Sequence, residues 1–439
     1  MKTRLFFAIS FLTITTFFGQ NYYMSQPEGF GSATTGGGTT SPLTIYTYAE
    51  LKAAIKLSTP QVILVSGIIT FPNGGAISEV FQNKTILGLP GAKLVNDNQT
   101  TGAGIFYLKN GSNNVIIRNL IFEGPGAYDV DGKDNLTADG CMNLWVDHCD
   151  FQDGQDGNFD IKGNSDNITV SWCKFQYLKA PKSGGSGGSN DHRYTNLIGS
   201  SASQAPVDGH YSVTFQNNYW GNGCVERMPR ARNAELHILN CYYNTDVSSS
   251  TALGLGGGIN NLTCYVEGTH FAKIKNVYKS YVSSDGGIVG VNFDSCINGV
   301  NNVGAVSKPT YNYSSFAASD VESFVTNATC GAGANLQVSS GGLISSNCGN
   351  LSINTYSLVD NLRYYPSQIE NNFTIDCFNV TGKAEFQVYS VIGKQVYKIT
   401  KQITKGEKII TNFSHLSSGL YICRLSVNEN TANWKIIKK

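Results

Sequence analysis

The sequence has 439 residues, a formal net charge of +1, 14% charged residues and 48 glycines. Few charges and many glycines argue against a coiled coil or a helical bundle and are typical of a turn-rich β protein. The length is sufficient for one large domain and a smaller one. Residues 369–439 carry ten Lys or Arg and five Asp or Glu, so the central part is net negative. We expect no nucleic-acid partner, and a polyanion would need a local basic cluster or a bridging cation.

Residues 1–20 have the pattern of a signal peptide. Lys2 and Arg4 are followed by an apolar run at 5–18, which is short for a membrane span. No other stretch is apolar enough to cross a bilayer. We therefore expect an exported protein, extracellular or attached to the cell surface. Export permits disulfides without requiring them.

The cysteines give two kinds of expectation. Four of them, interpreted as one recurring position of a repeat, should pack as small apolar residues: Cys149, Cys173, Cys241 and Cys264. Two disulfides are also conceivable, one joining Cys330 to Cys348 and the other joining Cys377 to Cys423. No Cys or His spacing indicates a zinc site.

A short helix is predicted at 48–56, where Leu51, Ala54 and Ile55 have helical spacing. We expect it to cap one end of a repetitive fold, because an uncapped end would expose the core.

The middle of the chain contains a repeated β-prone segment. Each copy has alternating apolar residues, a polar or small corner and then an aromatic residue. The copies are NVIIRNLIF (114–122), NLWVDHCDF (143–151), NITVSWCKF (167–175), SVTFQNNYW (212–220), ELHILNCYY (235–243) and TCYVEGTHF (263–271). Their last residues are 29, 24, 45, 23 and 28 apart. A period of this length predicts a parallel β-helix, an all-β solenoid, rather than a β-sandwich. The gap of 45 suggests an additional coil around 197–199.

The pattern changes after about residue 340. Residues 369–439 alternate apolar and polar side chains between turn signals, which predicts a small antiparallel β domain with a sandwich-like architecture. We therefore divide the chain into a signal peptide (1–20), a β-helix domain (21–345), a linker (346–368) and a C-terminal domain (369–439).

Three aspartates are candidate metal ligands. Asp156 and Asp160 are four residues apart and would face the same side of a strand. Asp134 lies one repeat period earlier, so it could stack beside them. Three carboxylates on one face repel each other unless a cation neutralises them, and hard oxygen donors favour Ca²⁺.

Three arginines form a local basic strip at Arg227, Arg230 and Arg232. Guanidinium groups match carboxylates with two parallel hydrogen bonds. A basic strip beside a calcium-binding cluster would suit an acidic polysaccharide. By contrast, Asp147 and His148 look like a catalytic pair, but His148 occupies the corner that holds asparagine in other repeats, so we interpret it as structural.

The motifs resemble polysaccharide lyase family one, the pectate lyases. The resemblance covers about 28–336. It is carried by GFGSATTGG (29–37), QVILVSGIITF (61–71), LWVDHCDF (144–151), FDIKGNSDNITVSWCKF (159–175), LIGSS (197–201), RMPRAR (227–232) and ASDVESFVTNATCGAGA (318–334). It implies a right-handed parallel β-helix that cleaves polygalacturonate by β-elimination with Ca²⁺.

The resemblance also implies residue roles. The matching positions for calcium ligands are Asp134, Asp156 and Asp160, and the one for the base that removes the C5 proton is Arg227. Arg232 and Lys162 match substrate-binding positions. Many members have a lysine where this chain has Tyr194, and Arg193 or Lys179 are the candidates to replace it. Because arginine normally stays protonated, this chemistry predicts an alkaline optimum.

The tail resembles the C-terminal sorting domain of type IX secretion, through VYSVIGKQV (388–396) and LSSGLYICRLSV (416–427). The resemblance implies that this domain contacts the secretion machinery and not the substrate. We expect a monomer.

Three alternatives remain open. A pectin lyase would act on methyl-esterified substrate, although such enzymes lack the calcium carboxylates. A β-helical glycosidase would use two carboxylates and would tolerate chelators. A non-catalytic β-helix that binds acidic glycans would keep the basic strip but would need no base.

Overall fold

The computed structural model describes residues 23–99, 103–130, 134–346, 362–366, 368–391, 393–427 and 430–439. The chain divides into two compact units, Met1–Cys348 and Gly349–Lys439. The predicted signal peptide and most of the predicted linker lie outside the described residues. Among the helices that are described, none has the length and apolar character to cross a membrane.

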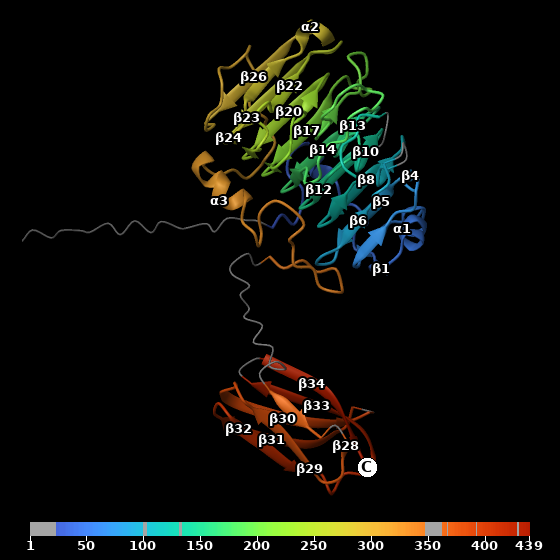
Figure 1. The fold of residues 1–439 in the computed structure, drawn as a ribbon, viewed down its shortest axis with the longest axis vertical. Helices are drawn as coiled ribbons and strands as arrows, with labels where there is room; N and C mark the ends of the chain where they lie inside the picture. Colours follow the sequence, from blue (N-terminus) through green and yellow to red (C-terminus); the bar gives the residue numbers. More distant parts are fainter. Residues whose placement is uncertain are drawn as a thin grey trace, which may run out of the picture. The chain divides into compact units, whose positions relative to one another are not determined.

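The first unit is a parallel β-solenoid with three sheets (Figure 1). The first, ten-stranded sheet contains, in order, β1 (Leu43–Ile45), β2 (Gln61–Val65), β5 (Gln82–Gly88), β8 (Asn113–Arg118), β11 (Met142–Asp147), β14 (Asp166–Ser171), β17 (Tyr211–Gln216), β20 (Ala234–Leu239), β23 (Leu262–Glu267) and β26 (Val289–Asp294). The second, eight-stranded sheet contains β3 (Ile68–Thr70), β6 (Lys93–Val95), β9 (Ile121–Glu123), β12 (Asp150–Gln152), β15 (Lys174–Gln176), β18 (Tyr219–Trp220), β21 (Tyr242–Asn244) and β24 (His270–Lys273). The third, also eight-stranded, contains β4 (Ile77–Glu79), β7 (Phe106–Leu108), β10 (Leu136–Asp139), β13 (Phe159–Lys162), β16 (Leu197–Ile198), β19 (Arg230–Ala231), β22 (Thr251–Leu255) and β25 (Asn276–Ser280).

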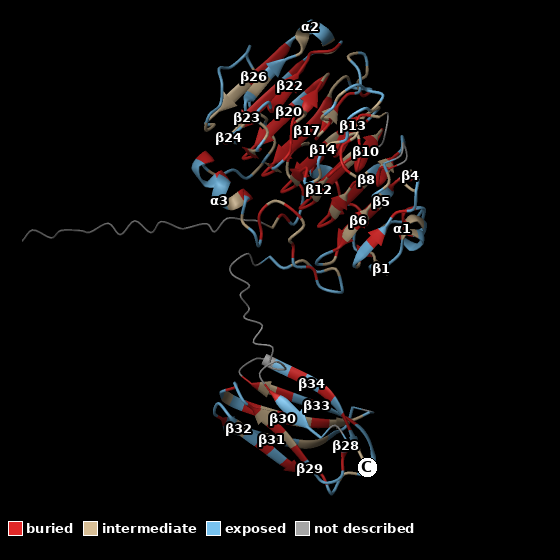
Figure 2. Cartoon of the chain, in the orientation of Figure 1, coloured by how far each residue is buried: buried red, intermediate tan, exposed pale blue. Residues whose placement is uncertain are grey.

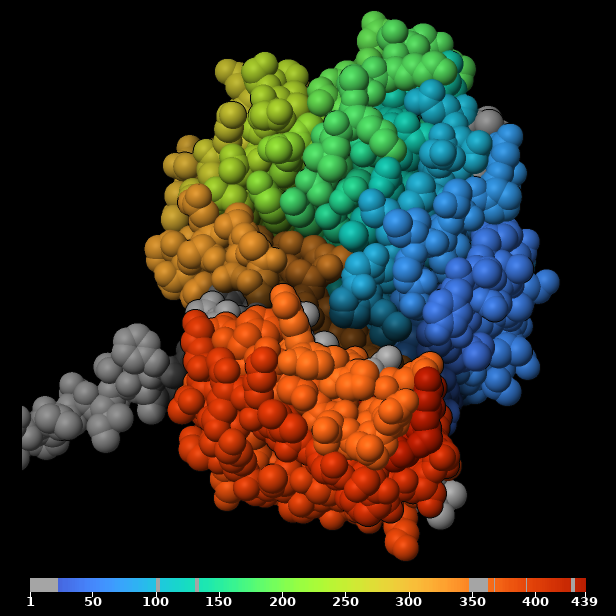
Figure 3. Space-filling view, turned by 60° about the horizontal axis from the view of Figure 1, so that its bottom comes forward, coloured from blue at the N-terminus to red at the C-terminus, as the bar shows by residue number. Residues whose placement is uncertain are grey.

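Each complete coil contributes one strand to each sheet, and β1 and β26 extend the first sheet at its two ends. Successive coils appear as adjoining bands of colour in the space-filling view (Figure 3). Buried residues follow the strands through the whole solenoid (Figure 2). The aromatic residues that end the six repeats form one continuous stack in the core, with ring centroids 4.6 to 5.4 Å apart. Its members are Phe122, Phe151, Phe175, Trp220, Tyr243 and Phe271. This column confirms the solenoid that the repeat predicts.

The additional coil expected around 197–199 does not exist. Phe175 of β15 pairs directly with Trp220 of β18, so the two segments belong to neighbouring coils. Leu197 and Ile198 form β16, the third strand of the coil that begins with β14. The spacing of 45 instead arises from two long loops, one between β15 and β16 that contains the Gly/Ser-rich segment 183–189, and one between β16 and β17.

The corner between the first and second sheets requires a left-handed backbone in every coil. Asn119, Asn217 and Asn240 adopt it with φ of 56°, 59° and 48°, and asparagine tolerates this conformation better than most residues. His148 takes the same place with φ of 45°. Its ring is buried, and Nδ1 lies 2.8 Å from the Asp147 carboxylate, which confirms its position in the corner.

Helix α1 (Tyr48–Ile55) covers one end of the solenoid core, as predicted. Thr47 and Glu50 form a capping box at its N-terminus. Its buried face consists of Leu51, Ala54 and Ile55, which join the main core cluster. The other short helical segments of this unit are η1 (Phe30–Ala33), α2 (Val282–Asp285), η2 (Ala318–Asp320) and α3 (Val321–Val325).

The second unit has two sheets and a hydrophobic core of its own. One sheet contains β27 (Arg363–Tyr365), β29 (Asn372–Cys377) and β32 (Glu407–Asn412). The other contains β28 (Gln368–Ile369), β34 (Asn430–Lys438), β33 (Gly419–Val427), β30 (Gly382–Ser390) and β31 (Gln395–Ile403). All pairs except β28 with β34 are antiparallel. The first strand begins at Arg363, ahead of the expected domain start at 369.

The expected disulfide between Cys377 and Cys423 is wrong, because both thiols are free and buried. Cys330 is disulfide-bonded, while Cys348 lies outside the described residues. Cys264 does not share a column with the other three repeat cysteines. It lies on β23 opposite Leu236, whereas the others lie two residues before the aromatic stack.

Candidate active site

Three carboxylates converge at one edge of the third sheet. Asp134 precedes β10, and Asp156 lies in the turn that leads into β13, which contains Asp160. The two strands pair in register, with Leu136 opposite Phe159. The backbone of Gly157 lies between the side chains: a Cβ there would be 2.7 Å from Asp134 Oδ1 and 3.3 Å from Asp160 Oδ1. Only glycine therefore leaves room beside these oxygens.

The protein does not satisfy all oxygens of this cluster. Asp134 Oδ2 accepts a hydrogen bond from the Thr137 hydroxyl at 2.7 Å. Asp160 Oδ1 accepts one from the Leu197 N–H at 2.9 Å. Asp134 Oδ1 is buried and has no hydrogen-bond partner. Because an unpaired buried carboxylate oxygen is costly, this atom marks a place for an external ligand.

The electrostatics of the cluster favour a cation. Burial, followed by the charge of Asp156, raises the pKa of Asp134 to about 6. Burial and then the charge of Asp134 raise the pKa of Asp160 well above its ordinary value. Both shifts mean that the ionised carboxylates repel each other in a poorly solvated place. The all-oxygen donor set, the unpaired oxygen and the space at Gly157 fit a hard ion such as Ca²⁺.

Arg227 lies beside this cluster. Its positive charge opposes the raised pKa values of Asp134 and Asp160. Its backbone has φ of 61°, a left-handed conformation that is rare and strained for arginine. Its guanidinium carbon lies 4.7 Å from the centroid of the Tyr194 ring. The chain therefore holds Arg227 in an unusual conformation next to the carboxylates.

The remaining arginines line a pocket that extends from Arg227. The pocket has a volume of about 430 Å³, and its wall includes Arg230, Arg232, Tyr281 and Asp285. Arg232 donates to Asp285 at 3.1 Å and to the Gly199 carbonyl at 2.8 Å, and 17% of its side chain stays exposed. Arg230 is buried, bonds to Asp285 and stacks on Tyr281 at 4.0 Å. Arg232 can thus contact a ligand in the pocket, whereas Arg230 is buried in contacts within the protein.

Lys162 is near the cluster and Arg193 is not engaged there. Lys162 ends β13, and its charge lowers the pKa of Asp134. Arg193 makes a bidentate ion pair with Asp191 at 2.6 and 2.7 Å and is absent from the wall of the arginine pocket. Lys179 binds Glu123 at 3.1 Å. Both side chains are paired with acidic residues here, and a substrate contact by either one stays a prediction.

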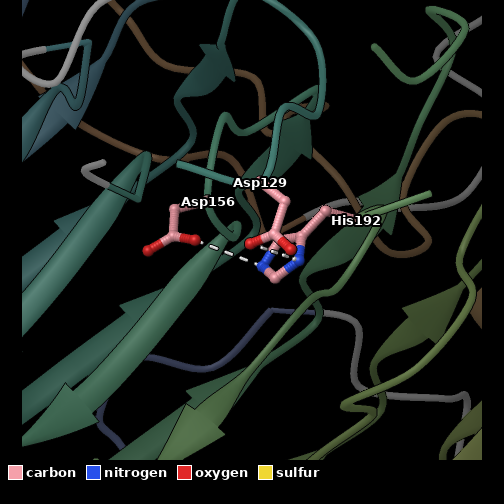
Figure 4. A group of neighbouring side chains, drawn as sticks. All are labelled: Asp129, Asp156 and His192. Carbon is pink, nitrogen blue, oxygen red and sulfur yellow. Dashed lines mark ion pairs between the residues drawn. The ribbon is translucent and has the colours of Figure 1, made fainter. Parts of the chain in front are cut away.

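Sequence reasoning missed Asp129, His192 and Asp285. The His192 ring lies between two carboxylates, 3.2 Å from Asp129 Oδ1 and 3.2 Å from Asp156 Oδ1 (Figure 4). The available signal was the position of His192, two residues before Tyr194 at the end of the long loop. No comparable sequence signal pointed to Asp285, because only the folded chain brings it to Arg230 and Arg232.

Two family models match the chain. Residues 21–335 match the model described as Pectate lyase. Residues 363–439 match the model described as Secretion system C-terminal sorting domain. Such a domain, attached to a family of secreted polysaccharide-degrading enzymes, indicates a secreted or cell-surface protein.

Several curated proteins are similar in sequence. A pectate trisaccharide-lyase from Thermotoga maritima is 36% identical over 234 residues, which are 50% of this chain and 57% of that protein. Pectate lyase plyB from Emericella nidulans is 36% identical over 232 residues, with 50% and 62% covered. The chain thus spans less than two thirds of the length of these relatives. Pectate lyase B from Colletotrichum gloeosporioides is 30% identical over 309 residues, with 68% and 83% covered.

Solved structures share the fold. A Bacillus subtilis pectate lyase matches with a TM-score of 0.54 at 20% identity, covering 70% of this chain and 96% of that one. A pectate lyase from Paenibacillus sp. 0602 matches with a TM-score of 0.54 at 17% identity, covering 72% and 97%. These likenesses concern the solenoid alone. Because the first family model covers residues 21–335, most of the sequence, the chain belongs to the pectate lyase family.

Proposed function

We propose that this protein is a calcium-dependent pectate lyase that cleaves polygalacturonate by β-elimination. The observation that carries the proposal is the carboxylate cluster: three aspartates, two of them with raised pKa values, with one unpaired buried oxygen and a strained arginine alongside. The family membership and the pectate lyases among the relatives support the reaction class.

Asp134, Asp156 and Asp160 would hold the ion through their carboxylate oxygens. Bound Ca²⁺ would also bind a uronate carboxylate, which acidifies the C5 proton and stabilises the charge that develops when this proton leaves. The pairing of β10 with β13 includes Asp160 and begins two residues after Asp134, so it would help to hold these side chains in place before substrate arrives. Such preorganisation avoids reorganisation at the moment of reaction.

Arg227 would act on the C5 proton. In the elimination, the C5–H bond breaks, its electron pair forms the C4–C5 double bond, and the C4–O bond breaks. The departing oxygen takes a proton from solvent. A free arginine side chain stays protonated at neutral pH, so Arg227 either accepts the proton in its neutral form or stabilises charge while hydroxide takes it. Both routes predict an alkaline optimum.

Arg232 and Lys162 would bind the substrate on either side of this centre. Arg232 faces the 430 Å³ pocket, where its guanidinium can pair with a uronate carboxylate. Lys162 lies on the carboxylate side. Arg193 has no part in this proposal, because Asp191 occupies its guanidinium. The sorting domain would serve export through the type IX machinery and would not contact substrate.

The test is to incubate the purified protein with polygalacturonate and Ca²⁺ at alkaline pH and to follow the absorbance of unsaturated uronides. We expect a rise that EGTA abolishes and added Ca²⁺ restores. New reducing ends without absorbance would show a hydrolase and contradict the proposal. If neither signal appears, the next experiments are lyase activity on methyl-esterified pectin and then glycan binding without cleavage.

A further inference from the structure

His192 is a buried histidine without an ordinary hydrogen bond. Only 5% of its surface is exposed. Each ring nitrogen lies 3.2 Å from a carboxylate oxygen, yet neither contact has the geometry of a hydrogen bond. His148 provides a comparison in the same protein: its Nδ1 lies 2.8 Å from Asp147 and does make the hydrogen bond. Both contacts of His192 are thus ion pairs that are longer than the hydrogen-bonded contact of His148.

The separation of His192 Nε2 from Asp156 Oδ1 suits two ligands of one metal ion. Zinc binds imidazole nitrogen and carboxylate oxygen at about 2.1 Å. Two such ligands that are 3.2 Å apart subtend about 100° at the metal, which is between the octahedral and tetrahedral angles. The lone pairs of two metal ligands point at the ion and not at each other. The two ligand atoms are therefore badly oriented for a hydrogen bond between them.

Asp129 is placed to orient the ring. It lies 3.2 Å from Nδ1, the nitrogen on the far side from Asp156 (Figure 4). The long loop fixes this carboxylate: the Ser189 N–H donates to Asp129 Oδ2 at 2.6 Å, and a Cβ at Gly187 would lie 2.0 Å from Asp129 Oδ1. The Gly/Ser-rich segment is thus shaped around Asp129. A metal-binding histidine usually donates its second ring N–H to a carboxylate, so the 3.2 Å contact with Asp129 would have to become a hydrogen bond when a metal binds Nε2.

We propose that His192 Nε2 and the Asp156 carboxylate, with Asp129 orienting the imidazole, form a site for a borderline divalent transition metal such as Zn²⁺. One donor atom from each of these three residues lies within 4.8 Å of the others. A nitrogen donor beside carboxylates favours such a metal over Ca²⁺, which prefers oxygen ligands. Asp156 would then belong both to this site and to the proposed calcium cluster. Only this shared use of Asp156 rests on the proposed function; the transition-metal site does not.

The test is a calorimetric titration of the full-length, chelator-treated protein with Zn²⁺ alone, without polysaccharide or Ca²⁺. We expect one bound zinc ion, with tenfold to hundredfold weaker binding in Asp129→Asn and a larger loss in His192→Gln, which removes a direct ligand. The matched control is His237→Gln. It removes another buried histidine, which lies on β20 of the first sheet and contacts Tyr311. It should bind zinc as the wild type does. Thermal unfolding of each variant checks that it is folded.

A second measurement uses Co²⁺, whose visible absorbance reports its ligands. The spectrum should change in His192→Gln and stay unchanged in His237→Gln. Equal zinc affinity in the wild type and His192→Gln, or no zinc binding by the wild type, would overturn the site. If Ca²⁺ does not weaken zinc binding, Asp156 is not shared. Since these titrations contain no substrate, their failure is distinct from the absence of lyase activity.

Discussion

Arg227 lies over the ring of Tyr194, with its guanidinium carbon 4.7 Å from the ring centroid. Tyr194 fills the position at which many pectate lyases have a substrate-binding lysine, and its ring also packs on His192 at 4.2 Å. A tyrosine cannot replace the charge of a lysine. It can hold the guanidinium in place by a cation–π contact, which contributes about 0.5 to 2 kcal/mol depending on solvent exposure. We infer that Tyr194 positions Arg227.

The first prediction concerns this contact. Tyr194→Ala should lower kcat by about 2- to 30-fold, the rate equivalent of losing about 0.5 to 2 kcal/mol. Tyr194→Phe keeps the ring and should retain most of the activity. Initial rates on polygalacturonate at saturating Ca²⁺ give both values. A Phe variant as impaired as the Ala variant would show that the hydroxyl, and not the ring face, is what matters.

The second prediction concerns Arg227 itself. Arg227→Lys and Arg227→Ala should reduce kcat by about 100-fold or more, the usual effect of losing a group that handles a proton in the transition state. Binding of oligogalacturonate, followed by calorimetry with the inactive variants, should change far less. Arg424→Ala in the second unit is the matched control for loss of an arginine. If turnover survives in Arg227→Ala, the proposed role of this residue is wrong.

The third prediction is a pH dependence of stability in the absence of metal. Burial and the charge of Asp156 raise the pKa of Asp134 from its ordinary 3.8 to about 6. The folded state therefore binds more protons than the unfolded state between about pH 4 and 6, and stability falls as the pH rises through this window. With EGTA present, the solenoid should unfold at a lower temperature at pH 8 than at pH 5.

Calcium and one substitution check the cause of this effect. Added Ca²⁺ should restore the unfolding temperature at pH 8, because it neutralises the repelling carboxylates. Asp134→Asn should reduce the difference between pH 5 and pH 8 in EGTA. Scanning calorimetry of the full chain measures all of these transitions. An unchanged pH dependence in Asp134→Asn would assign the effect to other groups.

The sequence allowed the solenoid to be predicted because one physical pattern repeats in it. Phe151 and Phe175 occupy the same place in successive coils and stack in the core, so periodicity alone located the column. The extra coil was predicted wrongly because a spacing of 45 is nearly twice the period. Only the glycine and serine content of 183–189 indicated a loop.

The candidate site could be predicted in part, for a related reason. Asp134, Asp156 and Asp160 lie at or just before third-sheet strands of neighbouring coils, so the repeat brings them close together, although Asp160 is opposite Thr137 and not Asp134. His192 lies near the end of the long loop, and Asp285 ends α2, between β25 and β26, so tertiary contacts bring them to their places. Arg193 shows the reverse case. Its motif position predicts a substrate contact, which stays a prediction, but gave no sign of the ion pair that Arg193 makes with Asp191.

The last prediction tests the space inside the carboxylate cluster. A Cβ at Gly157 would lie 2.7 Å from Asp134 Oδ1, the unpaired oxygen, and 3.3 Å from Asp160 Oδ1. Gly157→Ala should displace these oxygens, and overpacking of this kind costs about 1 to 3 kcal/mol. The Ca²⁺ concentration for half-maximal activity should therefore rise roughly tenfold to hundredfold. Gly341→Ala is the control, because its Cβ would meet nothing closer than the Ser339 hydroxyl at 3.9 Å. Unchanged calcium affinity in Gly157→Ala, measured both by activity and by direct titration of the free protein, would show that the ion does not bind beside Asp134 Oδ1.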